Sequence, residues 1–523
     1  MTTEIQETEY KYDAAPGTGL PPLAGLPQVA DVSRAETETL TAEYYDTDDL
    51  RLIRAGITLR RREGGADEGW HLKFPDHGGN ARGASSRREL RLPLGRAGDP
   101  VPGELARLVV AHTRGAALGP VARVETRRRR TTLRDSAGNS LAEVAEDDVA
   151  AQTLGSSTTL SRWNEVEVEL ANGGPPLLRA ADERLRAAGL RPAMHPVKLE
   201  RALAAGLPAA GGSTGRLQAD GGEGRLAAGS PSGEVVLAYA ARQAARLKAL
   251  DTAVRRDEPD AIHQMRVTTR RLRSTLQSFT VIWPSAATGH LKDELKWLGQ
   301  VLGDARDAEV LSEYFRTGLE GTPTELVLGP AKARITVHFA PRETAARSAV
   351  FQALDSRRYF ALLDELDRLL SEPPRTPAAQ TAAGEALPGA VARTYRRAKR
   401  RMRRAERTPA GSRRDAALHE ARKAARRARY AAEAVTPVFG KDARRFARRM
   451  KAVQSVLGGQ HDAVTARDAV RDIGVRANLA GENAFSFGLL YERAHRDALE
   501  YQHEARHVWK RATRRKSLKW LGL

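Results

Sequence analysis

Residues 261–273 read Ala261-Ile262-His263-Gln264-Met265-Arg266-Val267-Thr268-Thr269-Arg270-Arg271-Leu272-Arg273. As an α-helix, with about 100° between successive residues, this stretch gathers cationic side chains within an arc of roughly 80°: His263, Arg266, Arg270 and Arg273. Apolar side chains fill a neighbouring arc: Ile262, Met265, Leu272, Leu276 and Phe279. The stretch therefore predicts a helix with an apolar face toward a core and a narrow basic stripe beside it.

The same spacing returns about 155 residues later, in a second stripe formed by His419, Arg422, Arg426 and Arg429. A further short match follows each stripe: Val301-Leu302-Gly303 before Arg306-Asp307, and Val456-Leu457-Gly458 before His461-Asp462. Two elements that recur in the same order predict an internal duplication. A single basic helix face is usually a solvated surface, but its repetition favours a shared anionic ligand.

Composition limits the possible partners. The chain has 523 residues, enough for two or three domains, and a formal net charge of +20. The expected partner is therefore a polyanion: nucleic acid, an acidic membrane surface or phosphate chains. The sequence contains no cysteine, which excludes disulfides and thiolate metal sites. No apolar run approaches the roughly 18 residues of a membrane span, and no signal peptide is recognisable, so we expect a soluble, cytoplasmic protein.

Charged residues recur at every second position in the N-terminal third. The rows are Glu7, Glu9 and Lys11; Arg60 and Arg62; Arg87, Glu89 and Arg91; and Glu165, Glu167 and Glu169. Alternation of this kind indicates β-strands, and turn signals such as Gly64-Gly65 between them indicate a closed antiparallel barrel. If the charged rows point inward, the barrel encloses a polar tunnel. The alternative is a sheet whose charged face points to water.

Inward-facing charges have a chemical use only if an anion enters the barrel. Arginine matches phosphate oxygens with two parallel donors, and lysine adds a compact positive charge. Glutamates beside phosphate are the natural setting of Mg²⁺, which binds through carboxylates, waters and substrate phosphates.

Residues 206–232 are rich in glycine, alanine and serine, which predicts a flexible linker. We therefore expect a first domain over residues 1–205, a helical domain over 233–513 and a basic C-terminal tail over 514–523. From Val235 onward strand alternation disappears and helix-forming residues dominate. The predicted fold class is α+β multidomain, with an N-terminal antiparallel β-barrel tunnel and a C-terminal all-α duplicated helical bundle.

Several motifs follow one another in the N-terminal domain: Glu7-x-Glu9-x-Lys11, Tyr44-Tyr45-Asp46-Thr47-Asp48, Arg60-x-Arg62, Trp70-x-Leu72-Lys73, Arg87-x-Glu89 and Glu165-x-Glu167. This ordered set resembles the CYTH superfamily, the triphosphate tunnel metalloenzymes. The resemblance implies Mg²⁺ or Mn²⁺ held by glutamates that are also the catalytic residues: Glu7, Glu9, Glu165 and Glu167. It implies a triphosphate bound by Lys11, Arg60, Arg62, Lys73, Arg87, Arg128, Arg130 and Lys198.

Two departures accompany this resemblance. The family's late Ser-Lys pair is Val197-Lys198 here, which removes a hydroxyl group. The run Arg127–Arg130 is basic on both faces of a strand, so its register stays open, with Arg128 and Arg130 favoured as the inward pair. Asp147 is a further candidate for the tunnel interior.

The duplicated basic stripes and the two Leu-Gly-x-x-x-Asp echoes make residues 235–510 similar to the CHAD domain, a helical module associated with inorganic polyphosphate. The implied polyphosphate-binding residues are His263, Arg266, Arg270, Arg273, His419, Arg422, Lys423, Arg426 and Arg429. For the two histidines, the alternative is a buried histidine satisfied at a helix interface. The roles of Arg306, Asp307, His461 and Asp462 stay open between ligand contact and internal pairing.

The sequence thus predicts a metal-dependent triphosphatase, acting on inorganic tripolyphosphate or a related triphosphate, joined to a domain that binds long-chain inorganic polyphosphate. One alternative is a non-catalytic module that docks on polyphosphate. Nucleic-acid binding has less support, because aromatic residues make up only 5% of the chain and stacking platforms need them. We expect no membrane partner, and a cytoplasmic location that includes polyphosphate granules.

Overall fold

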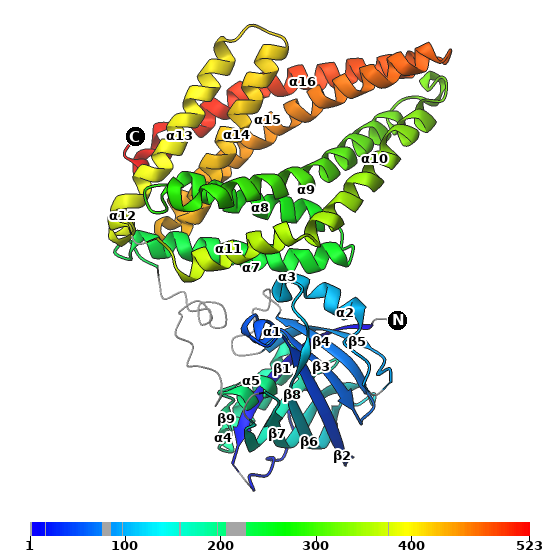
Figure 1. Cartoon of the computed structure of the whole chain (residues 1–523), viewed down its shortest axis with the longest axis vertical. Coiled ribbons are helices and arrows are strands. Elements are labelled where there is room, and N and C mark those ends of the chain that lie inside the picture. Colours follow the sequence, from blue (N-terminus) through cyan, green and yellow to red (C-terminus); the bar gives the residue numbers. More distant parts are fainter. Residues whose placement is uncertain are drawn as a thin grey trace. The chain divides into compact units, whose positions relative to one another are not determined.

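The structure is a computed structural model that describes residues 3–15, 17–75, 85–96, 98–155, 158–195, 197–204, 226–374 and 376–523. The chain forms two compact units, Met1–Ala219 and Asp220–Leu523 (Figure 1). Most of the predicted linker, up to residue 225, lies outside the described residues. Within the described ranges, no helix has the length and apolar content needed to cross a membrane.

The first unit is an antiparallel β-barrel (Figure 1). Its strands are β1 (Thr3–Ala14), β2 (Asp31–Asp46), β3 (Thr58–Glu63), β4 (Gly69–Pro75), β5 (Ser85–Leu92), β6 (Gly119–Arg134), β7 (Ser140–Thr153), β8 (Leu160–Leu170) and β9 (Arg191–Pro192). They pair in the order β5-β4-β3-β2-β6-β7-β8-β1-β9, and a further pairing of β5 with β1 closes strands β1 to β8 into a ring. The predicted closed barrel is confirmed.

The barrel carries charged rows on its inner face, and apolar layers cover parts of its outer face. On β1, Tyr10 packs outward in an apolar layer with helix α4 (Pro175–Ala187), whereas its neighbour Glu9 faces inward. A second outer layer joins β3, β4 and β5 to α1 (Arg51–Arg54) and α2 (Gly103–Leu108). Because side chains alternate across a strand, a register shift of one residue would bury the charged side chains in these apolar layers. The outer layers therefore fix which residues face the interior.

One part of the interior is apolar. Helix α5 (Lys198–Leu203) packs through Leu199, Ala202 and Leu203 against Trp163 and inward-facing residues of β2, β6 and β7. The predicted polar tunnel therefore occupies only part of the barrel, because this apolar cluster fills the rest. The first residue of α5 lies at the boundary between the two parts.

The second unit is helical (Figure 1). Its helices are α7 (Ser232–Arg255), α8 (Ala261–Ser278), α9 (Ser285–Glu320), α10 (Ala331–Leu354), α11 (Arg357–Ser371), α12 (Pro377–Gln380), α13 (Ala383–Arg407), α14 (Ser412–Ala434), α15 (Thr436–Leu479) and α16 (Phe485–Ala512). Helices α7 to α10 and α13 to α16 form two successive groups of the same order. The predicted all-α bundle is confirmed.

The two groups meet through reciprocal backbone contacts. The N–H of Ser232, at the start of α7, donates to the carbonyl of Thr381 at 2.9 Å, and the N–H of Ala383, at the start of α13, donates to the carbonyl of Ser230 at 2.8 Å. The start of α7 and the start of α13 thus each donate one backbone hydrogen bond to the residues just before the other helix. This exchange is what an internal duplication predicts, with α7 and α13 as counterparts.

Helix α15 bends sharply at Gly440, whose φ of 49° and ψ of −119° are not helical. A positive φ favours glycine because it has no Cβ to clash with the backbone. The straight part of α15 therefore starts at Lys441. In the first copy, the corresponding helix α9 starts at Ser285.

Residues 514–523, expected to be a basic tail, form two short 3₁₀ helices, η2 (Arg515–Ser517) and η3 (Lys519–Leu521). Trp520 packs on Phe439 and Phe446, with ring centroids 5.3 and 6.1 Å apart. Aromatic packing of this kind attaches the end of the chain to the helical unit.

Candidate functional site: the barrel interior and the α8/α14 stripes

The barrel interior brings together most of the residues predicted to bind metal and triphosphate. Side chains from five strands and the start of α5 meet there: Glu7, Glu9, Lys11, Arg60, Arg62, Lys73, Arg128, Glu165, Glu167 and Lys198. Of the other two, Arg130 pairs with Glu38 at 2.5 Å and Arg87 stands opposite Glu7 in the β1–β5 register.

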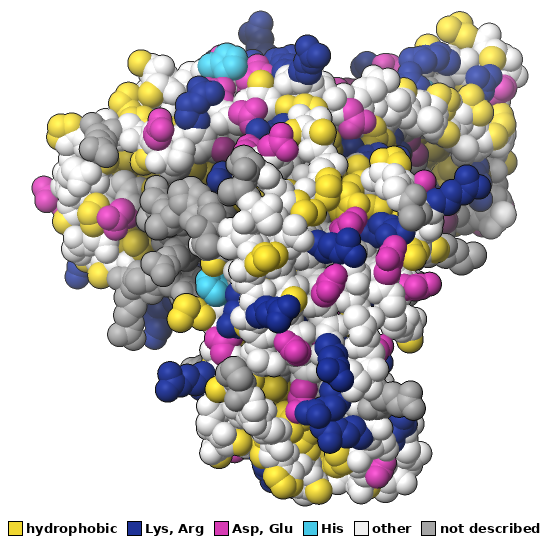
Figure 2. Space-filling model, turned by 60° about the horizontal axis from the view of Figure 1, so that its bottom comes forward, with side chains coloured by type: hydrophobic (Ala, Val, Ile, Leu, Met, Phe, Trp, Pro, Cys, Tyr) yellow, Lys and Arg dark blue, Asp and Glu magenta, His cyan; other side chains and the backbone are white. Residues whose placement is uncertain are grey.

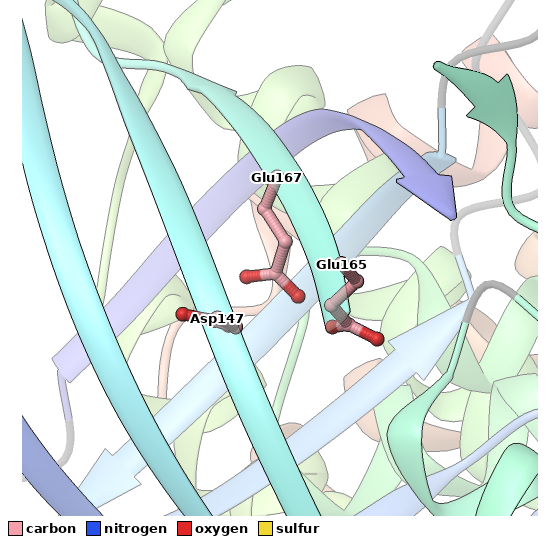
Figure 3. Close-up of side chains that lie close together, drawn as sticks. All are labelled: Asp147, Glu165 and Glu167. Atoms are coloured by element: carbon pink, nitrogen blue, oxygen red, sulfur yellow. The ribbon is translucent and has the colours of Figure 1, made fainter. Parts of the chain in front are cut away.

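Three buried carboxylates form the centre of this interior: Asp147 of β7 and Glu165 and Glu167 of β8 (Figure 3). One oxygen atom of each lies within 4.8 Å of the others. The ammonium group of Lys198 is 2.9 Å from Asp147, 2.5 Å from Glu165 and 2.6 Å from Glu167. The three acids therefore converge on one position for a positive charge.

Further cations surround Glu167. Arg128 donates to Asp147 at 2.8 Å through Nε and to Glu167 at 2.7 Å through a terminal nitrogen, and Lys11 Nζ lies 2.7 Å from Glu167. Burial alone would raise the pKa of Glu167, but the charges of Lys11 and Lys198 outweigh it and hold that pKa well below its usual range. Glu167 is therefore ionised at neutral pH.

A second group of charges surrounds Lys73 of β4. Its Nζ lies 2.5 Å from Glu7 and 3.4 Å from Glu89. Burial raises the pKa of Glu7 by more than the charge of Lys73 lowers it. Glu9 lies 3.5 Å from Lys11 instead. The four glutamates predicted to bind metal therefore do not gather around one lysine, because Glu7 faces Lys73 whereas Glu165 and Glu167 face Lys198.

Glu169 is an interior carboxylate that the prediction left out. It stands directly opposite Glu9 in the pairing of β1 with β8. Burial, followed by the charge of Glu7, raises the pKa of Glu169 to about 7. The sequence contained the signal, because Glu165, Glu167 and Glu169 alternate and so share one face of a strand.

His71 and Glu89 form a buried pair that also escaped prediction. His71 Nδ1 lies 2.8 Å from Glu89, and His71 Nε2 lies 2.9 Å from the carbonyl oxygen of Asp67. Burial lowers the pKa of His71 to about 3, so its neutral ring has a single N–H, which it can donate either to Glu89 or to the carbonyl oxygen of Asp67. His71 therefore lies against the carboxylate that faces Lys73. The alternation in Trp70-His71-Leu72-Lys73 places His71 and Lys73 on the same face.

Tyr44 of β2 adds a phenol to the same interior. Arg60 donates to its hydroxyl oxygen at 3.4 Å. Burial would raise the pKa of Tyr44, but the charges of Arg60 and Lys198 outweigh it and lower that pKa below its usual value. A phenol held among cations is a hydrogen-bond donor placed beside an anion site.

The basic stripes of α8 and α14 meet in the helical unit, where the two helices pack together. Arg271 of α8 donates to Glu433 of α14 at 3.1 Å, and Arg427 of α14 donates to Gln277 of α8. Arg271 corresponds to Arg427 and Gln277 to Glu433 in the duplication, so each helix contacts the other through the same position. The two predicted stripes therefore face one shared region.

Arginines from both stripes form one cluster: Arg266 and Arg270 of α8, and Arg422 and Arg426 of α14. Burial, followed by the nearby charge of Arg270, lowers the pKa of Arg426 to about 9. Burial also lowers the pKa of Arg270, and the positive charges of Arg266 and Arg422 act on it in the same direction. Like charges held this close favour a bound anion.

Glycines make room for this cluster. A Cβ added to Gly303 would lie 3.3 Å from the guanidinium of Arg266, and one added to Gly458 would lie 3.5 Å from that of Arg422. Arg266 also donates to Asp307 at 2.8 Å. The Leu-Gly-x-x-x-Asp echoes therefore support the stripes.

Three of the residues of open role, Asp307, His461 and Asp462, lie beside residues of the stripes, whereas Arg306 pairs outside them. Arg306 pairs with Glu309 at 3.0 Å, and the His461 ring lies 4.0 Å from the ring of His419. Burial raises the pKa of Asp462, which the charge of Arg422 partly offsets. Among the described residues Arg306 and Asp307 do not pair with each other, because Arg306 pairs with Glu309 and Asp307 with Arg266.

His263 and His419 occupy corresponding positions in the two stripes. The Nδ1 atom of each is buried and has no hydrogen-bond partner among the described residues. Burial lowers the pKa of His419 to about 4, with a contribution from His461. Burial also lowers the pKa of His263. Both rings are therefore neutral near pH 7 in the ligand-free protein.

The remaining predicted residues lie at the edges of the stripes. Lys423 pairs with Glu420, and Arg429 donates to Glu433 at 2.6 Å. The Nε of Arg273 is buried without a hydrogen-bond partner in the described part of the chain.

The α8/α14 cluster differs from an ordinary charged surface. On the face drawn in Figure 2, lysine and arginine side chains are interspersed with aspartate and glutamate. In the cluster, by contrast, Arg266 alone forms an ion pair, whereas Arg270, Arg422 and Arg426 have none among the described residues. This excess of positive charge marks the α8/α14 stripes as a candidate anion site.

Comparison with known families divides the chain in the same way. Residues 6–191 match the model of the CYTH domain, and residues 238–471 match that of the CHAD domain. An uncharacterised protein of Mycobacterium tuberculosis H37Rv is 37% identical over 505 residues, which cover 93% of this chain and 92% of that protein.

Similar solved structures cover one part of the chain each. PptA from Streptomyces chartreusis aligns with a TM-score of 0.44 and 23% identity, over 54% of this chain and 100% of its own. A putative adenylyl cyclase from Hippeastrum, described as having a dominant triphosphatase activity, aligns with a TM-score of 0.25 and 14% identity, over 38% of this chain and 96% of its own. On the family models and the mycobacterial relative, the chain belongs to the proteins in which a CYTH domain is followed by a CHAD domain.

Proposed function

We propose that the CYTH barrel is a divalent-metal-dependent triphosphatase, which hydrolyses a phosphoanhydride of inorganic tripolyphosphate or a related triphosphate, and that the CHAD domain binds long-chain inorganic polyphosphate. The observation that carries the proposal is the barrel interior, where buried lysines and arginines alternate with carboxylates. Its cations suit phosphate oxygens, and its carboxylates suit a hard divalent cation.

The donor set supports Mg²⁺ or Mn²⁺ as the cofactor. CYTH domains are metal-dependent, and the interior acids offer only oxygen donors, which these ions prefer. Glu7, Glu9, Glu165 and Glu167 are the proposed ligands, and Glu169, opposite Glu9, joins them. When bound, the ion would offset negative charge on the transferred phosphoryl group and lower the pKa of a coordinated water.

The chain's own cations would hold the substrate. Lys11, Arg128 and Lys198 already face carboxylates in the ligand-free barrel. Phosphate oxygens would take the place of those carboxylates as partners of the three cations. Positive groups fixed before the substrate arrives stabilise the charge that spreads over the transferred phosphoryl group.

Phosphate release from tripolyphosphate tests the barrel proposal. Release is expected with Mg²⁺ or Mn²⁺ and is expected to stop when EDTA removes the metal. Tripolyphosphate binding without any release, at saturating metal, would contradict the catalytic proposal.

A second candidate is a non-catalytic module that docks on polyphosphate. The position of Lys198 favours it, because this ammonium group already occupies the centre of the three carboxylates. In that case calorimetry detects triphosphate binding and no phosphate appears. Both candidates share a cytoplasmic location, in association with polyphosphate granules.

The helical unit is expected to fold and bind polyphosphate by itself if it begins early enough. Ala228 and Ser230 accept hydrogen bonds from Gly384 and Ala383, both at 2.8 Å. A fragment starting at Leu226 keeps these contacts, whereas one starting at Ser232 loses them. We expect the free energy of unfolding of the shorter fragment to be lower by about 1–3 kcal/mol. Urea denaturation followed by circular dichroism measures the difference, and equal stabilities would contradict it.

Polyphosphate affinity is expected to rise as the pH falls from 7 to 5. A phosphate chain beside His419 would raise its pKa above the ligand-free value of about 4. Protonation is then linked to binding, so affinity increases through the bound-state pKa and levels off below about pH 4. The other charges around His419 are those of His461, Arg422, Lys423 and Glu420.

Calorimetry with long-chain polyphosphate at fixed salt measures this dependence. We expect a gain of at most about tenfold per pH unit from one histidine. His419→Gln is expected to flatten the profile. An unchanged profile in this variant would assign the pH dependence to another group.

A further inference from the structure

A basic pocket lies in the second copy of the duplicated domain, where the end of α14 meets the part of α15 that follows the bend at Gly440. Its volume is about 570 Å³. Cationic side chains from both helices line it: Arg429, Lys441, Arg444, Arg445, Arg448 and Lys451. The α8/α14 stripes described above do not include most of these residues.

Little negative charge offsets these cations. Glu433 pairs with Arg429 at 2.6 Å, and Asp442 lies 3.6 Å from Arg445. The other lining cations have no carboxylate within 4.0 Å in the described ranges: Lys441, Arg444, Arg448 and Lys451. An anion from outside would relieve the repulsion among them.

The first copy has basic or histidine side chains at the positions of Arg429, Arg445 and Lys451, but it lacks the other three cations. Gly303 of α9 corresponds to Gly458 of α15, and each lies against the matching arginine of its stripe. By this correspondence, the positions of Lys441, Arg444 and Arg448 hold Ala286, Gly289 and Asp293 in the first copy. Helix α9 forms and packs on α8 without the basic residues. A structural role therefore does not account for them.

The pocket is continuous with the basic stripe of α14. Arg429 is the last residue of that stripe and also lines the pocket. One turn earlier, Arg426 belongs to the cluster with Arg270. An extended anion lying along the stripe would reach the pocket by way of Arg429.

We propose that this pocket is an additional subsite for the phosphate chain, present in the second copy alone, which takes the phosphate units that extend beyond the α8/α14 stripes. The proposal rests on polyphosphate binding by the CHAD domain. It adds a dependence on chain length, because a chain short enough to end on the stripes gains nothing from the pocket.

The test replaces the pocket residues with those of the first copy where a helix allows it. The variant is Lys441→Ala, Arg444→Ala and Arg448→Asp. The first copy has glycine at the position of Arg444, but alanine is used there because glycine weakens a helix interior. A control variant removes the same charge from exposed cations of α10 and the far part of α15: Lys332→Ala, Arg342→Ala and Arg476→Asp. The barrel is identical in all proteins, so differences report on the helical unit.

Calorimetry on the full chain, with polyphosphates of graded length at several salt concentrations, gives the readout. We expect the pocket variant to lose at least about tenfold affinity for long chains. The slope of log affinity against log salt concentration is expected to fall by the amount that about three phosphate contacts contribute, by analogy with nucleic-acid phosphates. Affinity for the shortest chains that bind the stripes is expected to stay within about twofold of the wild type. The control variant is expected to match the wild type apart from a small uniform loss.

Three results would overturn the proposal. A pocket variant that behaves like the control has no subsite there. Equal losses for short and long chains would mean that the pocket holds a free, compact phosphate compound and not an extension of the chain. If the wild-type protein binds no polyphosphate of any length, the proposed function fails first, and the subsite fails with it.

Discussion

Glu7→Gln combined with Glu9→Gln is expected to lower metal-dependent hydrolysis of tripolyphosphate about a thousandfold, equivalent to ~4 kcal/mol of transition-state stabilisation. Both side chains are buried in the barrel interior, and a neutral amide there is a poor ligand for a hard divalent cation. Phosphate release at saturating Mg²⁺ measures the loss, and circular dichroism checks the fold.

A matched control makes the same two Glu→Gln substitutions at positions outside the barrel interior. Glu104→Gln with Glu125→Gln alters two exposed glutamates of the same domain and is expected to leave hydrolysis unchanged. Long-chain polyphosphate binding by the helical unit is expected to persist in both variants. Hydrolysis at the wild-type rate by the Glu7/Glu9 variant would show that these residues do not hold the metal.

Charge reversal in either basic stripe is expected to weaken long-chain polyphosphate binding by at least about 100-fold, or ~3 kcal/mol. The variants are Arg266→Glu with Arg270→Glu, and Arg422→Glu with Arg426→Glu. Because the four arginines form one cluster, each pair of substitutions places negative charge against the same phosphate units. The two variants are therefore expected to lose similar affinity.

Filter binding at fixed salt measures both losses. Arg342→Glu with Arg476→Glu, at exposed positions outside the cluster, supplies a control with the same change in net charge. A folded variant with either reversed pair that binds as tightly as the wild type would exclude its helix as a wall of the site.

Sequence patterns predicted the barrel because its charges alternate strictly. Glu7, Glu9 and Lys11 could share a strand face only if Tyr10 faced the other way, and the apolar layer beneath α4 holds that tyrosine. The same logic covered Glu169, but the two-residue motif that carried the family resemblance stopped at Glu167. The alternation itself continues to Glu169, which shares the strand face of Glu165 and Glu167.

The arrangement within the interior could not be predicted from spacing. Lys198 lies 31 residues beyond Glu167 in the chain and still sits 2.6 Å from it. Such contacts depend on how α5 enters the barrel and on which rotamers the neighbouring cations leave free. Periodicity gives the face of a residue, but it does not give its partner across the barrel.

The duplication was visible in the sequence, whereas the pocket was not. Corresponding stripes share a spacing, and a spacing can be read directly. The pocket lies where α15 continues after its bend at Gly440, and three of its cations, Lys441, Arg444 and Arg448, have no basic counterpart in the first copy. Lys441 and Arg448 stand where the first copy has Ala286 and Asp293, so a repeat that is recognised by its similarities does not point to them.

The reciprocal contacts of α8 with α14 also bear on how a ligand is oriented. The two helices are related by a half-turn, as the contacts of Arg271 with Glu433 and of Arg427 with Gln277 show. A chain that binds the stripes therefore meets the same surface in either of its two directions. Inorganic polyphosphate has no head or tail, and such a surface suits it, whereas a nucleic-acid strand is directional and would match only one half. The extra cations beside Gly440 break this equivalence. A polymer without intrinsic polarity would thus acquire a leading end when it binds.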